Sequence, residues 1–228
     1  MTALVLHYHP LSSYCHKVLI AVDVLGIEVD KRLLNLADTA ERAAYLALCP
    51  TGKMPLLVDQ GRPIPETSII IEHLQRRHAR PGHTVIPDDP EAALDVRLWD
   101  RLFDLYVMTP MQACTADLLR PEGDRDARSV ARAHEGLLSA YAFIDHQLKG
   151  RTWITGEAFS IADCAAAPAL FYAVTYVPLP SGHERLAAYF DRLMDHPPVA
   201  RTIDQARPYF KFYPGREGLS RRFYDEGG

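Results

Sequence analysis

The chain has 228 residues, 48% apolar and 24% charged, so it can bury a substantial core, and intrinsic disorder is excluded. Its 25 basic and 29 acidic residues give a net charge of −4, which argues against binding to nucleic acid or a membrane surface. No basic and apolar leader opens the sequence, and the four cysteines lack the spacing of a metal site or a disulfide framework. We therefore expect a cytoplasmic protein with reduced thiols and no bound metal.

The first 80 residues alternate between strand and helix patterns. Apolar or alternating runs predict strands at 3–8, 28–34 and 55–58, and helical patterns fill 13–25, about 39–48 and 67–79. A further short strand is expected just before the sequence ETS that begins at residue 66. This order is typical of an α/β unit with a partly parallel sheet.

The remainder of the chain is predicted to be helical. A Pro-, Gly- and Asp-rich linker at 80–91 separates it from the α/β unit, and Asp89 can cap a helix that begins at Pro90. In that helix, apolar side chains recur at near-helical spacing, which predicts packing on more than one neighbour: Leu94, Leu98, Trp99, Leu102, Phe103, Leu105 and Tyr106. Further helices are expected at about 124–149, 160–177, 184–195 and 198–206. We predict two domains, an α/β domain at 1–81 and an all-α domain at 88–228.

A stretch without Lys, Arg, Asp or Glu runs from Cys164 to His183. Its three prolines and polar end leave about 16 apolar residues, fewer than the roughly 20 that span a bilayer. A buried core helix is the better interpretation. At the start of this helix, Ser160 and Asp163 form the pattern of a capping box, whose role is folding.

The segment HPLSSYCHKV joins the first strand to the first helix. A strand, a Pro-containing loop and a Ser-Ser-Tyr-Cys helix start are arranged as in a thioredoxin-like domain, but Ser12 stands where the first cysteine of a redox pair is expected. Two roles for Ser12 are open from this stretch alone. Its hydroxyl could cap the helix, or it could donate a hydrogen bond to a thiolate at the helix N-terminus, where the helix dipole also favours an anion.

A second segment, CPTGKMPLLVDQGRPIPETSIII, contains groups suited to an amino-acid ligand. A cis bond at Met54–Pro55 would leave the Met54 backbone free to pair with an extended peptide. Thr67 can cap the following helix, whose first N–H groups can hold a carboxylate, and Glu66 adds a negative charge for an ammonium group. Together these groups fit the head group of an α-amino acid.

Four pieces of the chain carry a resemblance to a known family: HPLSSYCHKV, CPTGKMPLL, ETSIII and FSIADCAAAP. In order and spacing the chain resembles the cytosolic glutathione S-transferases over nearly its whole length, bacterial-like members with a serine-type motif similar to the theta and delta classes. The resemblance implies a thioredoxin-like domain that holds glutathione, followed by an all-helical domain that forms a hydrophobic pocket. It also implies a detoxifying transferase, in which glutathione is the co-substrate and supplies the attacking sulfur.

The resemblance assigns roles to individual residues. It implies that Ser12 is the catalytic residue that stabilises the glutathione thiolate. The expected glutathione-binding residues are Lys53, Met54, Pro55, Glu66 and Thr67, where Lys53 either reaches the glycyl carboxylate or is an ordinary surface lysine. The expected residues of the electrophile pocket are Leu11, Tyr106, Met111 and Tyr172.

Neighbouring residues have more ordinary interpretations. Ser13 is expected to cap the first helix, and Cys15 to be a buried packing residue. Tyr8 stands where tyrosine-type members keep their activating group, but a core position is favoured. The chain also departs from the family, with Cys49 in place of the usual Asn and Ala40 in place of a polar residue near the glycyl end of glutathione. Ser-Ser-Tyr-Cys differs from the run of the zeta-like isomerases, so maleylacetoacetate isomerisation is not favoured.

The last expectations concern the oligomeric state, the C-terminal tail and the alternative functions. Consecutive apolar residues at Ile69, Ile70 and Ile71, and mixed charges at Asp95, Arg97, Asp100 and Arg101, suit a homodimer, in which the resemblance brings Asp100 close to the partner's glutathione. The aromatic, basic C-terminal tail is expected to fold over the pocket. The alternatives to transfer are reduction of a hydroperoxide at the same site and a non-catalytic binding protein.

Overall fold

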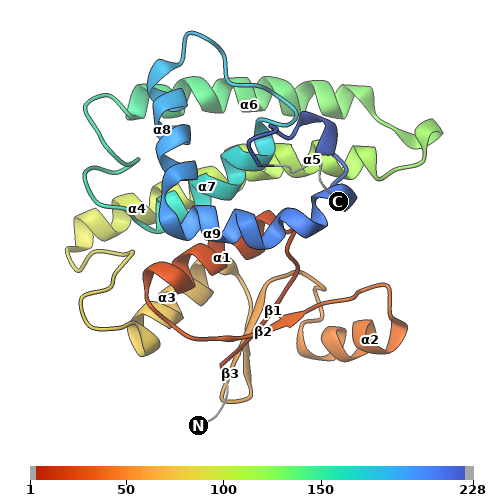
Figure 1. Cartoon of the computed structure of the whole chain (residues 1–228), viewed down its shortest axis with the longest axis vertical. Coiled ribbons are helices and arrows are strands. Elements are labelled where there is room, and N and C mark those ends of the chain that lie inside the picture. Colours follow the sequence, from red (N-terminus) through yellow and green to blue (C-terminus); the bar gives the residue numbers. More distant parts are fainter. Residues whose placement is uncertain (1–3, 224–228) are drawn as a thin grey trace.

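The computed structural model describes residues 4–223 as two parts stacked on one another (Figure 1). The part that contains the N-terminus is built around a small sheet, and the other part is helical. Helix α1 (Ser13–Val24) lies between them and packs against helices of both parts. Most of its residues are buried, including the polar Ser13, His16 and Lys17.

The first part follows the predicted α/β order. Its elements are β1 (Val5–Tyr8), α1, β2 (Asp30–Leu33), α2 (Thr39–Leu48), β3 (Leu56–Asp59), β4 (Arg62–Ile64) and α3 (Thr67–His78). The sheet order is β2-β1-β3-β4, in which β2 is parallel to β1 whereas β3 is antiparallel to β1 and to β4. In register, Val5 is opposite both Asp30 and Val58. The predicted mixture of helices with a partly parallel sheet is confirmed.

Two hydrophobic cores hold these layers together. The larger core includes Leu6, Leu57 and Ile70 and continues into the helical part, because α1 and α3 pack together and α1 also contacts α7 and α9. The smaller core lies beneath α2 and consists of Leu34, Tyr45, Cys49 and Leu56.

The second part begins at α4 (Pro90–Leu102), where Asp89 caps the helix as predicted by accepting a hydrogen bond from the Ala92 N–H at 2.9 Å. Its further helices are α5 (Thr109–Leu118), α6 (Ala127–Gln147), α7 (Ile161–Ala173), α8 (Glu184–Asp195) and α9 (Pro197–Ala206). The sequence prediction missed α5. A π-helical segment, Phe103–Met108, joins α4 to α5 without a loop, so Pro110 lies in the first turn of a continuing helix.

The charge-free stretch is the core helix that the sequence predicts. All thirteen residues of α7 are buried, and its N-terminus carries the predicted capping box of Ser160 and Asp163. Among residues 4–223, no helix is both long and apolar enough to cross a membrane.

Apolar side chains of α4 and of the π-helical segment that follows it are partly buried in the core and partly exposed to solvent. Trp99 and Phe103 are buried in the core, whereas Leu94, Leu98 and Leu105 are 61%, 53% and 50% exposed. The helix therefore packs within its own chain on one side and presents leucines to solvent on the other.

Candidate active site

A first cleft of about 260 Å³ lies between the sheet domain and the start of the helical part. All five residues predicted to bind glutathione line it: Lys53, Met54, Pro55, Glu66 and Thr67. It is also lined by residues that the sequence reasoning did not assign, including Tyr14, Thr51, Arg101, Asp104 and Leu105. The cleft thus brings the Glu66 carboxylate, the N-terminus of α3 and two cations, Lys53 and Arg101, to one place.

The start of α3 differs from the prediction in one detail. Glu66, rather than Thr67, occupies the cap position, and Thr67 is the first helical residue. Glu66 has a φ of 71°, a conformation that costs a non-glycine residue on the order of 1–3 kcal/mol. Its side chain makes no hydrogen bond to the first turn, so the N–H groups there keep their capacity to bind an anion.

The peptide bond between Met54 and Pro55 is cis, as predicted. The loop that precedes it is held by the buried Tyr45 and Cys49 of the smaller core. The Tyr45 hydroxyl donates to the Lys53 carbonyl at 2.5 Å, and the Cys49 thiol contacts the same oxygen at 3.5 Å. Cys49 therefore takes over the anchoring of this loop, where the family pattern has an asparagine.

Of the two serines at the start of α1, Ser12 rather than Ser13 caps the helix. Ser12 is the N-cap of α1, and its oxygen accepts a hydrogen bond from the Cys15 N–H at 3.3 Å. Ser13 is buried inside the helix and accepts a bond from Gln112 of α5 at 3.0 Å. The expected capping role of Ser13 is wrong, because the helix begins one residue earlier than that role requires. Capping uses only the oxygen of Ser12 and leaves its hydroxyl hydrogen able to donate elsewhere.

A second cleft of about 340 Å³ adjoins the first, and Met54 lines both. Ser12 and three of the four predicted electrophile-pocket residues, Leu11, Met111 and Tyr172, line the second cleft. The C-terminal tail contributes Phe212, Tyr213 and Pro214 to the lining of this cleft; residues 224–228 of the tail lie outside the described chain.

The structure does not bring Tyr106 to the second cleft. Its side chain is 59% exposed and lies beside Trp99 and Phe143, between the π-helical segment and α6. Tyr106 belongs to the π-helical segment, and its neighbours there include Phe143 of α6.

Several polar side chains of the second cleft were missed by the sequence reasoning. His9 lines the cleft beside Ser12, and burial lowers the pKa of its imidazole. Thr115, Tyr176 and Tyr213 form a chain of hydroxyl contacts at 2.8 and 3.0 Å. The only local signal was the polar character of Gln112 and Thr115 in a helix that the sequence pattern did not reveal.

Cys15 and Tyr8 have the structural roles that were favoured for them. Cys15 is fully buried, and burial raises the pKa of its thiol to about 12, so it stays protonated and does not serve as a nucleophile. Tyr8 is half-buried, packs against the larger core and is absent from the lining of both clefts.

A buried ion cluster joins the two domains beneath the first cleft. The Lys17 ammonium of α1 lies 2.7 Å from the Asp100 carboxylate and 2.8 Å from that of Asp104. Burial lowers the pKa of Lys17, but the two carboxylates outweigh this effect and raise it overall, so the lysine remains charged. Asp100 is 1% exposed and also accepts a bond from Ser68, so the expectation that it approaches a partner's glutathione is wrong.

Comparison with known proteins identifies the family to which the chain belongs. The sequence model "Glutathione S-transferase, N-terminal domain" matches residues 6–82, and "Glutathione S-transferase, C-terminal domain" matches residues 127–192. The chain belongs to the glutathione S-transferase family. Glutathione S-transferase D7 of Drosophila melanogaster is 24% identical over 166 residues, which cover 72% of this chain and 71% of the relative.

Solved structures agree with the family assignment. A glutathione S-transferase of Methylobacillus flagellatus with glutathione bound has a TM-score of 0.79 and 28% identity, with 88% of this chain and 98% of that chain covered. One from Methylobacterium radiotolerans, in complex with glutathione sulfonate, has a TM-score of 0.73 and 27% identity, with coverages of 88% and 94%. Gtt2 of Saccharomyces cerevisiae, at 22% identity, a TM-score of 0.77 and coverages of 87% and 99%, shares the fold.

Proposed function

We propose that the protein binds glutathione in the first cleft and transfers its thiol to a hydrophobic electrophile in the second cleft. The observation that carries this proposal is the arrangement of the two clefts, which share Met54, with Ser12 lining the second. A tripeptide bound along the first cleft can present its sulfur at that junction. The second cleft, lined by Leu11, Met111 and Tyr172, offers an apolar wall for the electrophile.

Glutathione would be held by its two ends and its backbone. The Glu66 carboxylate pairs with the ammonium group, and the first N–H groups of α3 bind the neighbouring carboxylate. The backbone of Met54 pairs with the peptide. Ala40 lies in α2, is exposed and offers no polar side chain, so we propose that Lys53 or Arg101 receives the glycyl carboxylate.

Ser12 would favour the thiolate by donating its hydroxyl hydrogen to the glutathione sulfur. A thiol with a pKa near 8.5 is only about 3% ionised at neutral pH. Lowering this pKa by two units requires about 2.7 kcal/mol, which a hydrogen bond and the N-terminus of the twelve-residue helix α1 can supply together. The thiolate then attacks the electrophile, forming a carbon–sulfur bond as a leaving group departs or as a conjugated double bond takes up a proton.

Substitution of Ser12 tests this assignment. Ser12→Ala should lower turnover with a chloronitroaromatic electrophile on the order of a hundredfold, like the loss of one oxyanion donor, while glutathione still binds. Ser12→Thr, which keeps both the cap and the hydroxyl, should retain most of the activity, and Tyr8→Phe should change little. Full activity in Ser12→Ala with loss in Tyr8→Phe would overturn the assignment.

The same assay distinguishes the other functions that the sequence left open. A hydroperoxide offered in place of the electrophile tests for reductase activity, and calorimetric binding of glutathione without turnover of either substrate would identify a binding protein. We place the protein in the cytoplasm, since all four cysteines are buried free thiols.

A further inference from the structure

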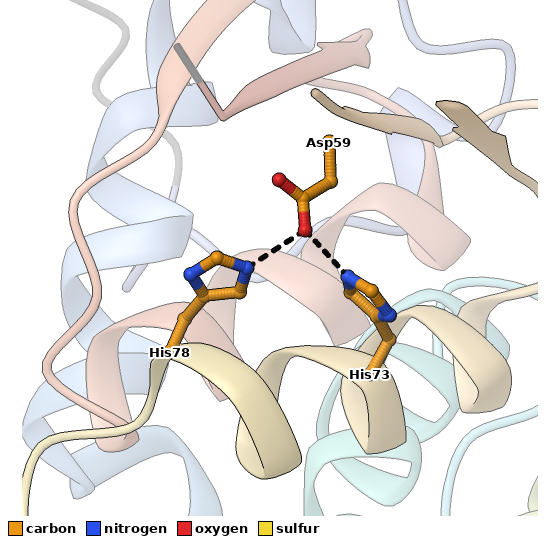
Figure 2. Close-up of side chains that lie close together, drawn as sticks. All are labelled: Asp59, His73 and His78. Carbon is orange, nitrogen blue, oxygen red and sulfur yellow. Dashed lines mark hydrogen bonds and ion pairs between the residues drawn. The ribbon is translucent and has the colours of Figure 1, made fainter. Parts of the chain in front are cut away.

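Three metal-binding side chains meet at the end of the sheet domain that is remote from both clefts. Asp59 is the last residue of β3, and His73 and His78 lie in the second half of α3. Figure 2 shows both imidazole rings directed at the same carboxylate oxygen, with each Nε2 atom 2.8 Å from Asp59 Oδ2. Within residues 4–223, no other three or more His, Cys, Asp or Glu residues bring potential ligand atoms within 4.8 Å of one another.

Ligand chemistry selects the kind of ion that could bind. Two imidazole nitrogens and one carboxylate oxygen suit Zn²⁺ and its late first-row neighbours, whereas Mg²⁺ and Ca²⁺ prefer ligands made entirely of oxygen. The four cysteines are buried and do not contribute a competing thiolate site. Asp59, His73 and His78 are therefore the group of side chains within residues 4–223 that best suits such an ion.

The present geometry is close to that of an occupied site. Tetrahedral ligands about 2.1 Å from zinc lie roughly 3.4 Å from one another. Each N–O separation, now 2.8 Å, must therefore widen by roughly 0.6 Å to admit the ion. The side chains of His73 and His78 are 15% and 28% exposed and can turn by this amount, and water can reach the remaining coordination position.

The Asp59 carboxylate is held in place between the two imidazoles. Its side chain is only 10% exposed, and one of its oxygens contacts both Nε2 atoms. The two histidines, five residues apart on α3, reach one oxygen because the Asp59 carboxylate lies between them.

We propose that Asp59, His73 and His78 bind one Zn²⁺ ion, with water completing the coordination. Each imidazole coordinates through Nε2 in its neutral form, so the hydrogen that Nε2 now donates to Asp59 moves to Nδ1 or to solvent. The site fastens the end of β3 to the end of α3. His73 and His78 follow Thr67, the first residue of α3, by six and eleven positions, so at about 1.5 Å per residue the ion lies roughly 9–16 Å along the helix from the N-terminus that lines the first cleft. It stabilises the fold and does not take part in thiol chemistry.

Titration of tag-free, EDTA-dialysed protein with ZnCl2 in the absence of glutathione tests the proposal. Calorimetry should give one Zn²⁺ per chain, and zinc should raise the melting temperature. In His73→Gln and His78→Gln, zinc affinity should fall by more than about a hundredfold, exceeding the 10–100-fold usual for residues behind the ligands. Glutamine can still donate a hydrogen bond to Asp59, so a purely structural network survives in these variants while ligation is lost.

A matched control variant and measurements on the wild type show which results would contradict the zinc site. His146, exposed on α6 and away from the cluster, should be replaceable in His146→Gln with no change in zinc affinity. Absence of zinc binding and of a zinc-dependent rise in melting temperature in the wild type overturns the proposal. Equal zinc affinity in the wild type and in the doubly substituted His73→Gln/His78→Gln protein also overturns it, because the ion would then bind elsewhere.

Discussion

Glu66 combines an unfavourable backbone with a side chain placed in the first cleft. A residue with a β-carbon is destabilised at a φ of 71°, whereas glycine adopts such values readily. The surrounding structure nevertheless holds this conformation, and it directs a carboxylate into the cleft beside the start of α3. We infer that the strain is retained because it positions the group that binds the ammonium of glutathione.

Substitutions of Glu66 should therefore affect binding and stability in opposite directions. Glu66→Gly should raise the free energy of unfolding by about 1 kcal/mol, because glycine removes the backbone cost. The same change should weaken glutathione binding by about 2–3 kcal/mol, because the ammonium loses its charged partner. Urea unfolding and titration calorimetry measure the two quantities.

Two control substitutions distinguish the effect of the Glu66 charge from the effect of its strained backbone conformation. Glu66→Gln removes the charge and keeps the strained backbone, so it should weaken binding without gaining stability. Glu28→Gln, on a carboxylate that is 95% exposed, should change neither quantity. Unchanged affinity in Glu66→Gln would mean that glutathione binds elsewhere.

At the scale of elements, the capping box of α7 makes more hydrogen bonds than its sequence pattern indicates. The Asp163 carboxylate, fully buried, accepts hydrogen bonds from the Ser160 N–H and hydroxyl at 2.9 Å each. It also accepts bonds from the Ile154 N–H at 3.1 Å and from the Tyr189 hydroxyl at 2.6 Å. Asp163 thus ties α7 both to the segment that precedes it and to α8.

Asp163→Ala should consequently cost about 3 kcal/mol or more of unfolding free energy, since it leaves buried donors without an acceptor. Asp126→Ala provides the matched control, because Asp126 is an exposed N-cap of α6 that accepts only local N–H groups. It should cost about 1 kcal/mol. Equal losses in urea unfolding would contradict the bridging role, and turnover per folded molecule should be unchanged in both variants.

The sequence predicted most elements because their hydrophobic periods and caps are local. It missed α5, because Pro110 resembles a boundary and the π-helical segment before it shifts the helical phase. At both α1 and α3, the cap lies one residue before the predicted one, since a Ser-Ser or Glu-Thr pair does not specify which residue leaves the helix.

Contacts that join distant segments could not be predicted from local patterns. Lys17 and Asp100 are 83 positions apart, and nothing near either residue indicates an ion pair. Arg97 and Asp100 were expected to belong to a dimer interface. Instead, each forms an ion pair within the chain, Arg97 with Glu72 and Asp100 with Lys17. The cluster of Asp59, His73 and His78 could not be predicted for the same reason, because Asp59 belongs to a strand and both histidines belong to a helix.

At the scale of the whole molecule, an apolar surface remains for a second copy of the chain. Leu94, Leu98 and Leu105 of the α4 side and Ile69 of α3 are each at least 50% exposed. Leu105 also lines the first cleft, so a partner that covered this surface would lie beside the glutathione site. Stable dimers bury roughly 1,200–2,000 Å² in total, and exposed large apolar groups of this kind are typical of such interfaces.

We therefore predict a homodimer that depends on the leucines of α4. Leu94→Glu/Leu98→Glu should dissociate it, because the substitutions place two charges per chain in a desolvated contact. Light scattering at micromolar concentration should give twice 25.6 kDa for the wild type and 25.6 kDa for the variant. Leu138→Glu, at a 44% exposed leucine on α6, is the control and should remain dimeric, because that position lies outside the proposed contact. A wild-type mass near 25.6 kDa would refute the dimer, and loss of the dimer in Leu138→Glu alone would move the interface to α6.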